Sequence, residues 1–218
     1  MPAPSREPWD LAQSMSRRLQ RANVAHRAQA DALLVWAAWS LDSAQLGWDL
    51  LQLARPSGDQ NLTGHPMHIV EMAAMNLVFR GVVSAMDQCA AAVFRLTGEP
   101  LRADRERHVA WWLDKSKTQP WSLVPPPLER WLRWFDGNRT WELATELRHA
   151  FTHRTVRRDV TIVIGAPKGY VHLEVAGVRH EAEEVMLELL TFGKQRYSAF
   201  EQALARSYPL RRGSRARR

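Results

Sequence analysis

The chain has 218 residues, 45% hydrophobic and 24% charged, a composition typical of one folded globular domain. The single cysteine, Cys89, excludes a disulfide framework and any metal site with several cysteine ligands, and we expect it to fill space in the core. The formal net charge is +7, but six arginines lie in residues 206–218, so residues 1–205 carry 24 basic against 23 acidic residues. The basic charge therefore belongs mainly to the tail, and the body of the protein is nearly neutral.

The apolar runs are too short for a membrane span of about 20 residues, which predicts no transmembrane helix. The first residues are rich in proline and lack the apolar stretch of a secretory signal, so we expect a cytoplasmic protein. We expect residues 1–8 to be disordered, residues 9–206 to form a single helical domain, and residues 207–218 to be a disordered basic tail.

Residues 10–54 contain no proline and repeat apolar side chains at helical spacing, which predicts one long helix with a bend near Gly47. We assign Trp36 and Trp39 on this helix to internal packing. Residues 56–64 have the composition of a loop. A second helix is predicted over residues 66–97, with Gly81 at a close contact between helices.

Residues 99–137 differ in character and are predicted to be an insertion between the helices of a bundle. They contain a charged helix over residues 103–113, a proline-rich segment, and a short amphipathic helix that ends at Phe135. Six of the ten tryptophans lie in or beside this insertion. Exposed indoles there would stack on single-stranded bases, but tryptophans more often fill a core or an interface.

A third bundle helix is predicted over residues 140–153. Apolar residues then alternate in residues 160–164 and 171–175, the pattern of a β-hairpin. The last helix is predicted over residues 181–207, with glutamates in its first turn as the helix dipole favours. The sequence thus predicts a mainly α fold, an antiparallel helical bundle with one β-hairpin before the last helix.

One segment at the end of the third bundle helix combines residue types suited to RNA cleavage. In residues 146–154 (ELRHAFTHR), Arg148 is followed directly by His149 and, after four intervening residues, by His153. The Arg-x4-His spacing alone occurs by chance in a chain with 26 arginines and eight histidines, and Arg21 to His26 is another copy. The copy at Arg148 is singled out by its context, because it ends a helix and precedes an extended segment.

This segment resembles the motif of HEPN ribonucleases, small helical domains found in toxin–antitoxin, abortive-infection and CRISPR systems and in ribosomal RNA processing. The resemblance implies a homodimeric, metal-independent RNA endonuclease without a cofactor, in which two protomers build one composite site. His153 would be the acid–base group and Arg148 the phosphate binder, with His149 orienting the substrate. It also implies a toxin or antiviral-defence setting, with an antitoxin or defence protein as partner.

The chemistry of these side chains suits that role. RNA cleavage without a metal needs one group to take the 2′-hydroxyl proton, one to protonate the leaving 5′-oxygen, and positive charge beside the phosphorane. A histidine titrates in the required range, and a guanidinium binds phosphate oxygens while it stays charged. Arg154, Arg157 and Arg158 follow the motif and are predicted to contact the RNA backbone.

Geometry leaves two alternatives open. Positions 148 and 153 are about 140° apart on a regular helix, so they share a face only if the last turn unwinds near Thr152. One alternative is that the motif is vestigial and the chain is a noncatalytic HEPN-like module that binds RNA or a partner protein. The other alternative is a metal-dependent bundle enzyme that resembles the DinB-like superfamily. Its ligands would come from one stripe of the third bundle helix and from the start of the second, and they are Glu142, Glu146, His149, His153, His65, His68 and Glu71.

Overall fold

The computed structural model describes residues 7–22, 24, 26–54, 65–97, 108–115, 123–153, 160–164, 171–175 and 177–210. The described elements are, in chain order, α1 (Pro8–Ala22), α2 (Arg27–Ala54), α3 (His65–Leu96), α4 (Val109–Lys115), α5 (Pro126–Arg133), α6 (Arg139–His153), β1 (Val160–Ile164), β2 (Val171–Val175), β3 (Val178–Glu181) and α7 (Ala182–Ser207). The mainly α bundle with a small antiparallel sheet before the last helix is confirmed. Of the predicted disordered ends, residues 1–8 and 207–218, residues 1–6 and 211–218 lie outside the described residues, whereas Pro8 begins α1 and Ser207 ends α7. Residues 99–107 and 116–122 of the predicted insertion also lie outside the described residues.

The prediction of one helix over residues 10–54 is wrong, because the chain turns at His26 between α1 and α2. His26 has a φ of +49°, in the left-handed region that ends a helix. Its carbonyl oxygen accepts the amides of Gln29 and Ala30, which begin α2. Histidine and asparagine tolerate the left-handed conformation better than most residues do. The helix can therefore break here without a glycine or a proline to mark the position in the sequence. α2 itself continues without interruption through Gly47.

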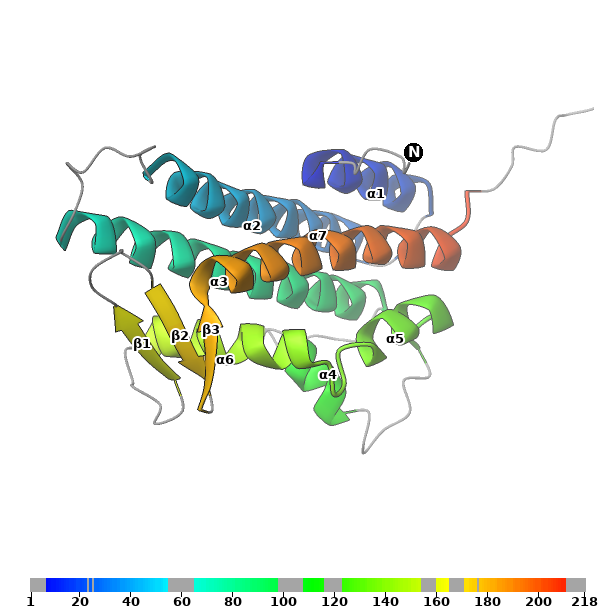
Figure 1. Cartoon of the computed structure of the whole chain (residues 1–218). Coiled ribbons are helices and arrows are strands. Elements are labelled where there is room, and N and C mark those ends of the chain that lie inside the picture. The colour runs from blue at the N-terminus through cyan, green and yellow to red at the C-terminus, as the bar shows by residue number, and fades with distance from the viewer. Residues whose placement is uncertain are drawn as a thin grey trace, which may run out of the picture.

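After the turn, α1 packs against both α2 and α7. The Ser14 hydroxyl donates to the Glu201 carboxylate at 2.9 Å. The Arg18 guanidinium donates to the carbonyl oxygen of Tyr208 at 3.1 Å, beyond the last turn of α7. Figure 1 shows α1 beside α2, next to the final turns of α7. The first and last helices of the described chain are therefore joined directly.

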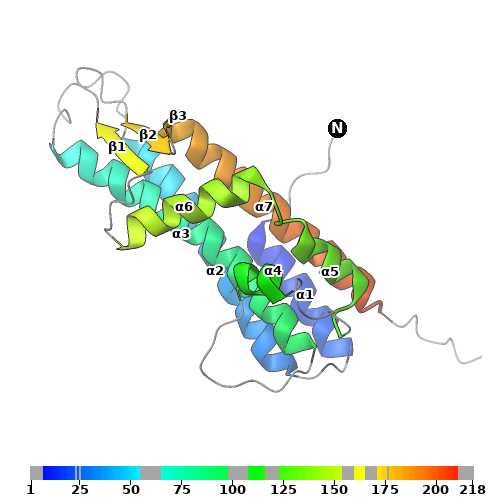
Figure 2. The same ribbon diagram turned by 90° about the horizontal axis from the view of Figure 1, so that it is seen from below.

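The long helices α2 and α3 pack closely because glycines remove side chains from their contact. A Cβ on Gly47 would lie 2.7 Å from the carbonyl oxygen of Ala74. A Cβ on Gly81 would overlap the carbonyl oxygen of Ser40 and lie 2.9 Å from the Cβ of Ala44. The predicted close helix contact at Gly81 is confirmed. In Figures 1 and 2, α7 runs beside α3, and α6 lies along α3.

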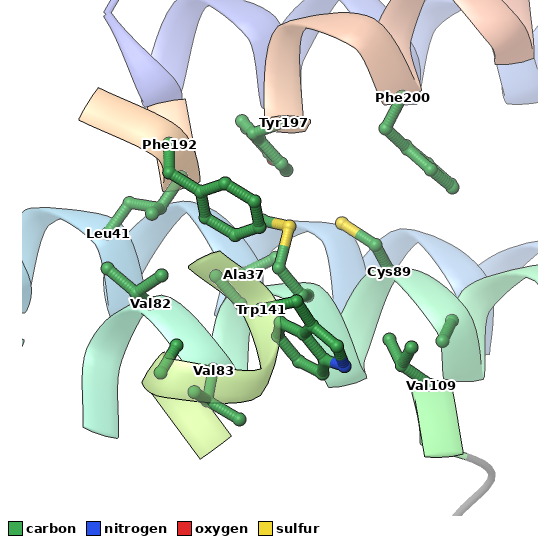
Figure 3. Close-up of a cluster of buried hydrophobic side chains, with 14 of the residues drawn as sticks. Ala37, Leu41, Val82, Val83, Cys89, Val109, Trp141, Phe192, Tyr197 and Phe200 are labelled. Carbon is green, nitrogen blue, oxygen red and sulfur yellow. The ribbon is translucent and has the colours of Figure 1, made fainter. Parts of the chain in front are cut away.

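The core is filled mainly from α2, α3 and α7 (Figure 3). Cys89 of α3 is fully buried, and burial raises the pKa of its thiol well above the ordinary value, so its predicted role as a core residue is confirmed. Tyr197 of α7 is also fully buried, and its hydroxyl donates to the carbonyl oxygen of Leu34 at 2.8 Å. That bond satisfies the one polar group of the tyrosine side chain inside the core.

The predicted hairpin is confirmed, and it is part of a larger sheet. β1 pairs antiparallel with β2, from Val160 opposite Val175 to Ile164 opposite Val171. A third strand, β3, pairs with the other edge of β2, so the order is β1-β2-β3. The turn before β3 contains Gly177 with a φ of +77°, which glycine adopts without strain. β3 is short, mostly exposed and followed directly by α7. Its sequence therefore does not alternate clearly between apolar and polar residues, and the strand was not predicted.

The described parts of the predicted insertion pack against the bundle through their tryptophans. The Trp112 indole of α4 donates to the carbonyl oxygen of Ala90, and the Trp131 indole of α5 donates to that of Arg196, both at 2.9 Å. Both rings are buried. These indoles are therefore core residues and are not available for base stacking.

The assignment of Trp36 and Trp39 to internal packing is wrong. Their side chains are about half exposed on the outer face of α2 and stack on each other. Helical periodicity locates an apolar stripe but does not show which of several stripes faces the core, because α2 is apolar over much of its circumference.

Among the described residues, the segment Ile69–Leu96 of α3 has the length and hydropathy that a membrane-crossing helix needs. More than half of its most apolar window is buried inside the protein, as in the core helix of a bundle.

Candidate functional site

The candidate site lies on α6, whose start is well defined. Gly137 has a φ of +64° and reverses the chain after α5. The Asn138 side chain accepts the backbone amide of Trp141 at 3.0 Å, a helix cap that satisfies one of the free amides of the first turn. The Thr140 hydroxyl donates to the Glu188 carboxylate of α7 at 2.8 Å. These contacts fix the helix that carries the Arg148 segment.

Arg148 lies where three helices meet. Its Nη1 donates to Oδ2 of Asp87 on α3 at 3.2 Å, and the Arg148 and Asp87 side chains are 31% and 20% exposed. The other carboxylate oxygen of Asp87 accepts the backbone amide of Val109 at the start of α4, at 3.1 Å. The guanidinium is therefore held in one orientation while part of it stays accessible to solvent.

The end of α6 is attached to α3 by an aromatic contact. Phe151 meets Phe79 edge to face, with ring centres 5.1 Å apart and planes inclined by 76°. Leu147 and Ala144 on the same side are fully buried. This packing keeps α6 helical to its last residue, His153.

The structure therefore does not contain the unwinding near Thr152 that would bring positions 148 and 153 onto one face. On the regular helix the two positions point about 140° apart. His149 is half buried next to Arg148. The side chain of His153, and all of Arg154, Arg157 and Arg158, lie outside the described residues. Within one chain, positions 148 and 153 of α6 therefore lie on different faces of the helix.

The metal hypothesis gains no support from the described side chains, among which no group of three His, Cys, Asp or Glu residues could hold an ion. Glu71 is buried on α3, while Glu146 and His149 on α6 are half buried and Glu142 is exposed. The side chains of His65 and His68, which that hypothesis also uses, lie outside the described residues.

A second candidate surface is a shallow groove between α5 and α7, which sequence reasoning missed. Its volume is about 200 Å³, and its lining contains three arginines and no carboxylate: Pro127, Arg130, Trp131, Trp134, Arg196, Ala199, Gln202, Ala203 and Arg206. The Arg196 guanidinium lies over the Trp134 ring, with 3.8 Å between its central carbon and the ring centre. The surrounding burial lowers the pKa of Arg196 to about 10.

This groove has the elements that bind single-stranded nucleic acid, namely clustered positive charge beside a partly exposed indole. A signal existed in the sequence, because positions 196, 199, 203 and 206 share one face of a helix. It did not stand out in a chain with 26 arginines, and only the packing of α5 on α7 brings Arg130 to the other two arginines.

No protein-family model matches the chain, and no curated protein or solved structure matches it significantly. The fold defines the protein as a mainly α helical bundle with a small antiparallel sheet. Any functional assignment rests on the side chains described above.

Proposed function

We propose that the protein is a metal-independent RNA endonuclease of HEPN type that acts as a homodimer. The observation that carries the proposal is Arg148, whose guanidinium is bonded to Asp87 at 3.2 Å while its side chain stays 31% exposed, on the helix that ends at His153. Preorganised positive charge is what stabilises a phosphorane, since no reorganisation is needed as negative charge develops.

The divergence of positions 148 and 153 on a regular helix favours a site made by two protomers. One chain cannot aim both side chains at the same phosphate without unwinding α6. A two-fold axis beside α6 would let Arg148 of one protomer face the partner's His153, and the same pair would form again across the axis. The dimer then supplies two arginines and two histidines to one cleft.

In such a cleft one histidine takes the proton of the 2′-hydroxyl, and the 2′-oxygen attacks the adjacent phosphorus. The other histidine donates a proton to the 5′-oxygen as its bond to phosphorus breaks. The products are a 2′,3′-cyclic phosphate and a 5′-hydroxyl, so no water, metal or cofactor is consumed. The positive charge of Arg148 stabilises the negative charge of the phosphorane, and His149 beside it orients the substrate.

The salt bridge with Asp87 leaves N–H donors of the Arg148 guanidinium available to bind a phosphate. A guanidinium has five N–H donors, and the contact with Asp87 uses one of them. It is the one polar contact of the Arg148 side chain within the described part of the chain. Arg154, Arg157 and Arg158 would extend the basic surface along the RNA backbone.

The test is incubation of the purified chain with RNA in EDTA, beside Arg148→Ala and His153→Ala. Each variant should lose cleavage, whereas Arg139→Ala, which removes an exposed arginine from the start of the same helix, should retain it. Cleavage that survives both substitutions, or that requires a divalent ion, would exclude this function. A toxin or antiviral-defence role, with an antitoxin or defence protein as partner, is the biological setting we propose for it.

A second candidate, a noncatalytic HEPN-like module that binds RNA, is favoured by the arginine-lined groove between α5 and α7. Arg148 would then have a structural role in its pair with Asp87. This function predicts RNA binding without cleavage, unchanged by His153→Ala.

A further inference from the structure

The outer face of α2 carries an apolar surface that nothing in the described chain covers. Its large side chains are Trp36, Trp39, Leu46 and Leu53, which are 52%, 53%, 52% and 81% exposed, together with Leu50. The two indoles stack with ring centres 5.1 Å apart and planes inclined by 12°. We call this surface, with Ala32 and Ser43 at the same spacing, the α2 stripe.

The members of the α2 stripe follow a strict pattern. They occupy positions 32, 36, 39, 43, 46, 50 and 53, so the intervals alternate between four and three residues. This repeat of 3.5 residues is the seam along which two helices pair with knobs-into-holes packing. The opposite side of α2 carries the fully buried Leu34 and Leu41, so the stripe points away from the core.

The size of the α2 stripe fits an interface. Its side chains expose on the order of 600 Å² of apolar surface, the upper end for the largest patch of an ordinary monomer. A stable dimer buries about 800 Å² on each partner, including a polar rim. The stripe and its immediate surroundings approach that area.

The charge around the α2 stripe selects the kind of partner. Residues 28–54 contain three aspartates, Asp31, Asp42 and Asp49, and no lysine or arginine. Residues 28–54 themselves offer no cation to RNA or to an anionic membrane, and their carboxylates repel both. Lys194 of α7, beside them, is bonded to Gln45. An apolar protein surface is the occupant that this face fits.

We propose that the α2 stripe binds the α2 stripe of a second copy of the chain, with the two helices antiparallel about a two-fold axis near Leu41. In this register Trp36 faces the partner's Leu46, Ala32 faces the partner's Leu50, and Ser43 faces the partner's Trp39. Two of these pairs place a small residue opposite a large one, which makes room for Leu50 and Trp39. A parallel pairing would place each indole against its own copy.

This interface is separate from the composite RNA site. α3 lies between α2 and α6, so the α2 stripe and Arg148 are on different sides of the bundle (Figure 1). Pairing through α2 leaves both copies of Arg148 uncovered. A chain that uses both surfaces has two different two-fold axes and forms a tetramer or a larger assembly.

The first test is the mass of the full chain in solution, measured by light scattering or sedimentation. Trp36→Glu with Leu46→Glu should halve the assembly mass while the circular dichroism and melting temperature stay unchanged. Leu187→Glu, on an equally exposed apolar position of α7, should leave the mass unchanged. A monomeric wild-type chain, or an assembly whose mass the two glutamates leave unchanged, would overturn the proposal.

The second test determines the register in which the two α2 helices pair. The double variant Trp39→Cys with Ser43→Cys should form a disulfide-linked dimer on mild oxidation, because the two positions face each other across the interface. Either cysteine alone should not, since each is offset from its own copy by about 6 Å along the axis. The buried Cys89 does not compete. Absence of the crosslink overturns this register. Loss of RNA cleavage in the Arg148 and His153 variants bears only on the proposed function.

Discussion

The guanidinium of Arg148 and the carboxylate of Asp87 join α6 to α3 at 3.2 Å, and the same carboxylate holds the first turn of α4 through the Val109 amide. One aspartate therefore positions both the candidate phosphate-binding arginine and a helix of the tryptophan-rich region. Any change of Asp87 acts on packing and on the orientation of Arg148 together.

Asp87→Ala should lower the free energy of unfolding by about 1–2 kcal/mol, because it removes the ion pair and leaves the Val109 amide without its acceptor. Asp87→Asn should cost less, since an amide oxygen still accepts from Val109. Urea unfolding measures both. Glu129→Gln in the exposed pair with Arg133 is the matched control and should change stability little. Equal losses for the alanine and asparagine variants would contradict the role of the Val109 bond.

Gly81→Ala should destabilise the protein by about 1–3 kcal/mol, although alanine favours a helix by up to about 1 kcal/mol over glycine. The new Cβ meets the Ser40 backbone, which cannot move without shifting α2. Gly193→Ala should cost less, because its Cβ meets only the ends of the Leu41 and Val82 side chains, 2.9 and 3.2 Å away. Thermal melts compare the two, and a larger loss at Gly193 would contradict this account of the α2–α3 contact.

Stability should depend on pH through Asp42. Burial raises the pKa of this carboxyl above 3.8, against the opposing effect of a hydrogen bond from Trp9. The folded chain therefore holds this proton to a higher pH than the unfolded chain, so the stabilising contribution of protonated Asp42 is lost as pH rises through its folded pKa. Asp42→Asn should flatten this part of the pH–stability profile. A variant profile with the same slope as wild type in that range would contradict the assignment.

We expect the arginines of the groove between α5 and α7 to set both the affinity for RNA and the dependence of that affinity on salt. Arg130→Gln with Arg206→Gln should weaken binding of single-stranded RNA and reduce the slope of log affinity against log salt by roughly 0.7 for each lost phosphate contact. Arg17→Gln with Arg80→Gln removes the same charge from exposed sites on other helices and should leave the slope unchanged. Titrations at several salt concentrations decide this, and equal changes in both pairs would show that only net charge matters.

The Cys89 thiol should be inert in the native protein. It is fully buried and its pKa is raised, so the thiolate that reacts with a disulfide reagent is scarce and inaccessible. One thiol per chain should react in denaturant. Rapid stoichiometric labelling of the native chain would show that α3 opens readily at this point.

The sequence predicted those elements whose signals are local. The span of α6 and the strands β1 and β2 follow from periodicity and glycine positions, and their bounds agree with the structure within one residue. The turn at His26 was missed because a left-handed histidine has no sequence marker. The contact of Arg148 with Asp87 was missed because it joins residues 61 positions apart, and only the packing of α6 on α3 brings them together.

The contacts of α1 with α7 link the two extremes of the described chain. Ser14 and Arg18 bind Glu201 and Tyr208, about 190 residues later. During synthesis α1 emerges well before α7, so α1 waits through the translation of the intervening residues with its apolar side only partly covered. This part of the fold is completed only after α7 has been made, and a fragment lacking either helix would leave its counterpart's buried surface open to aggregation.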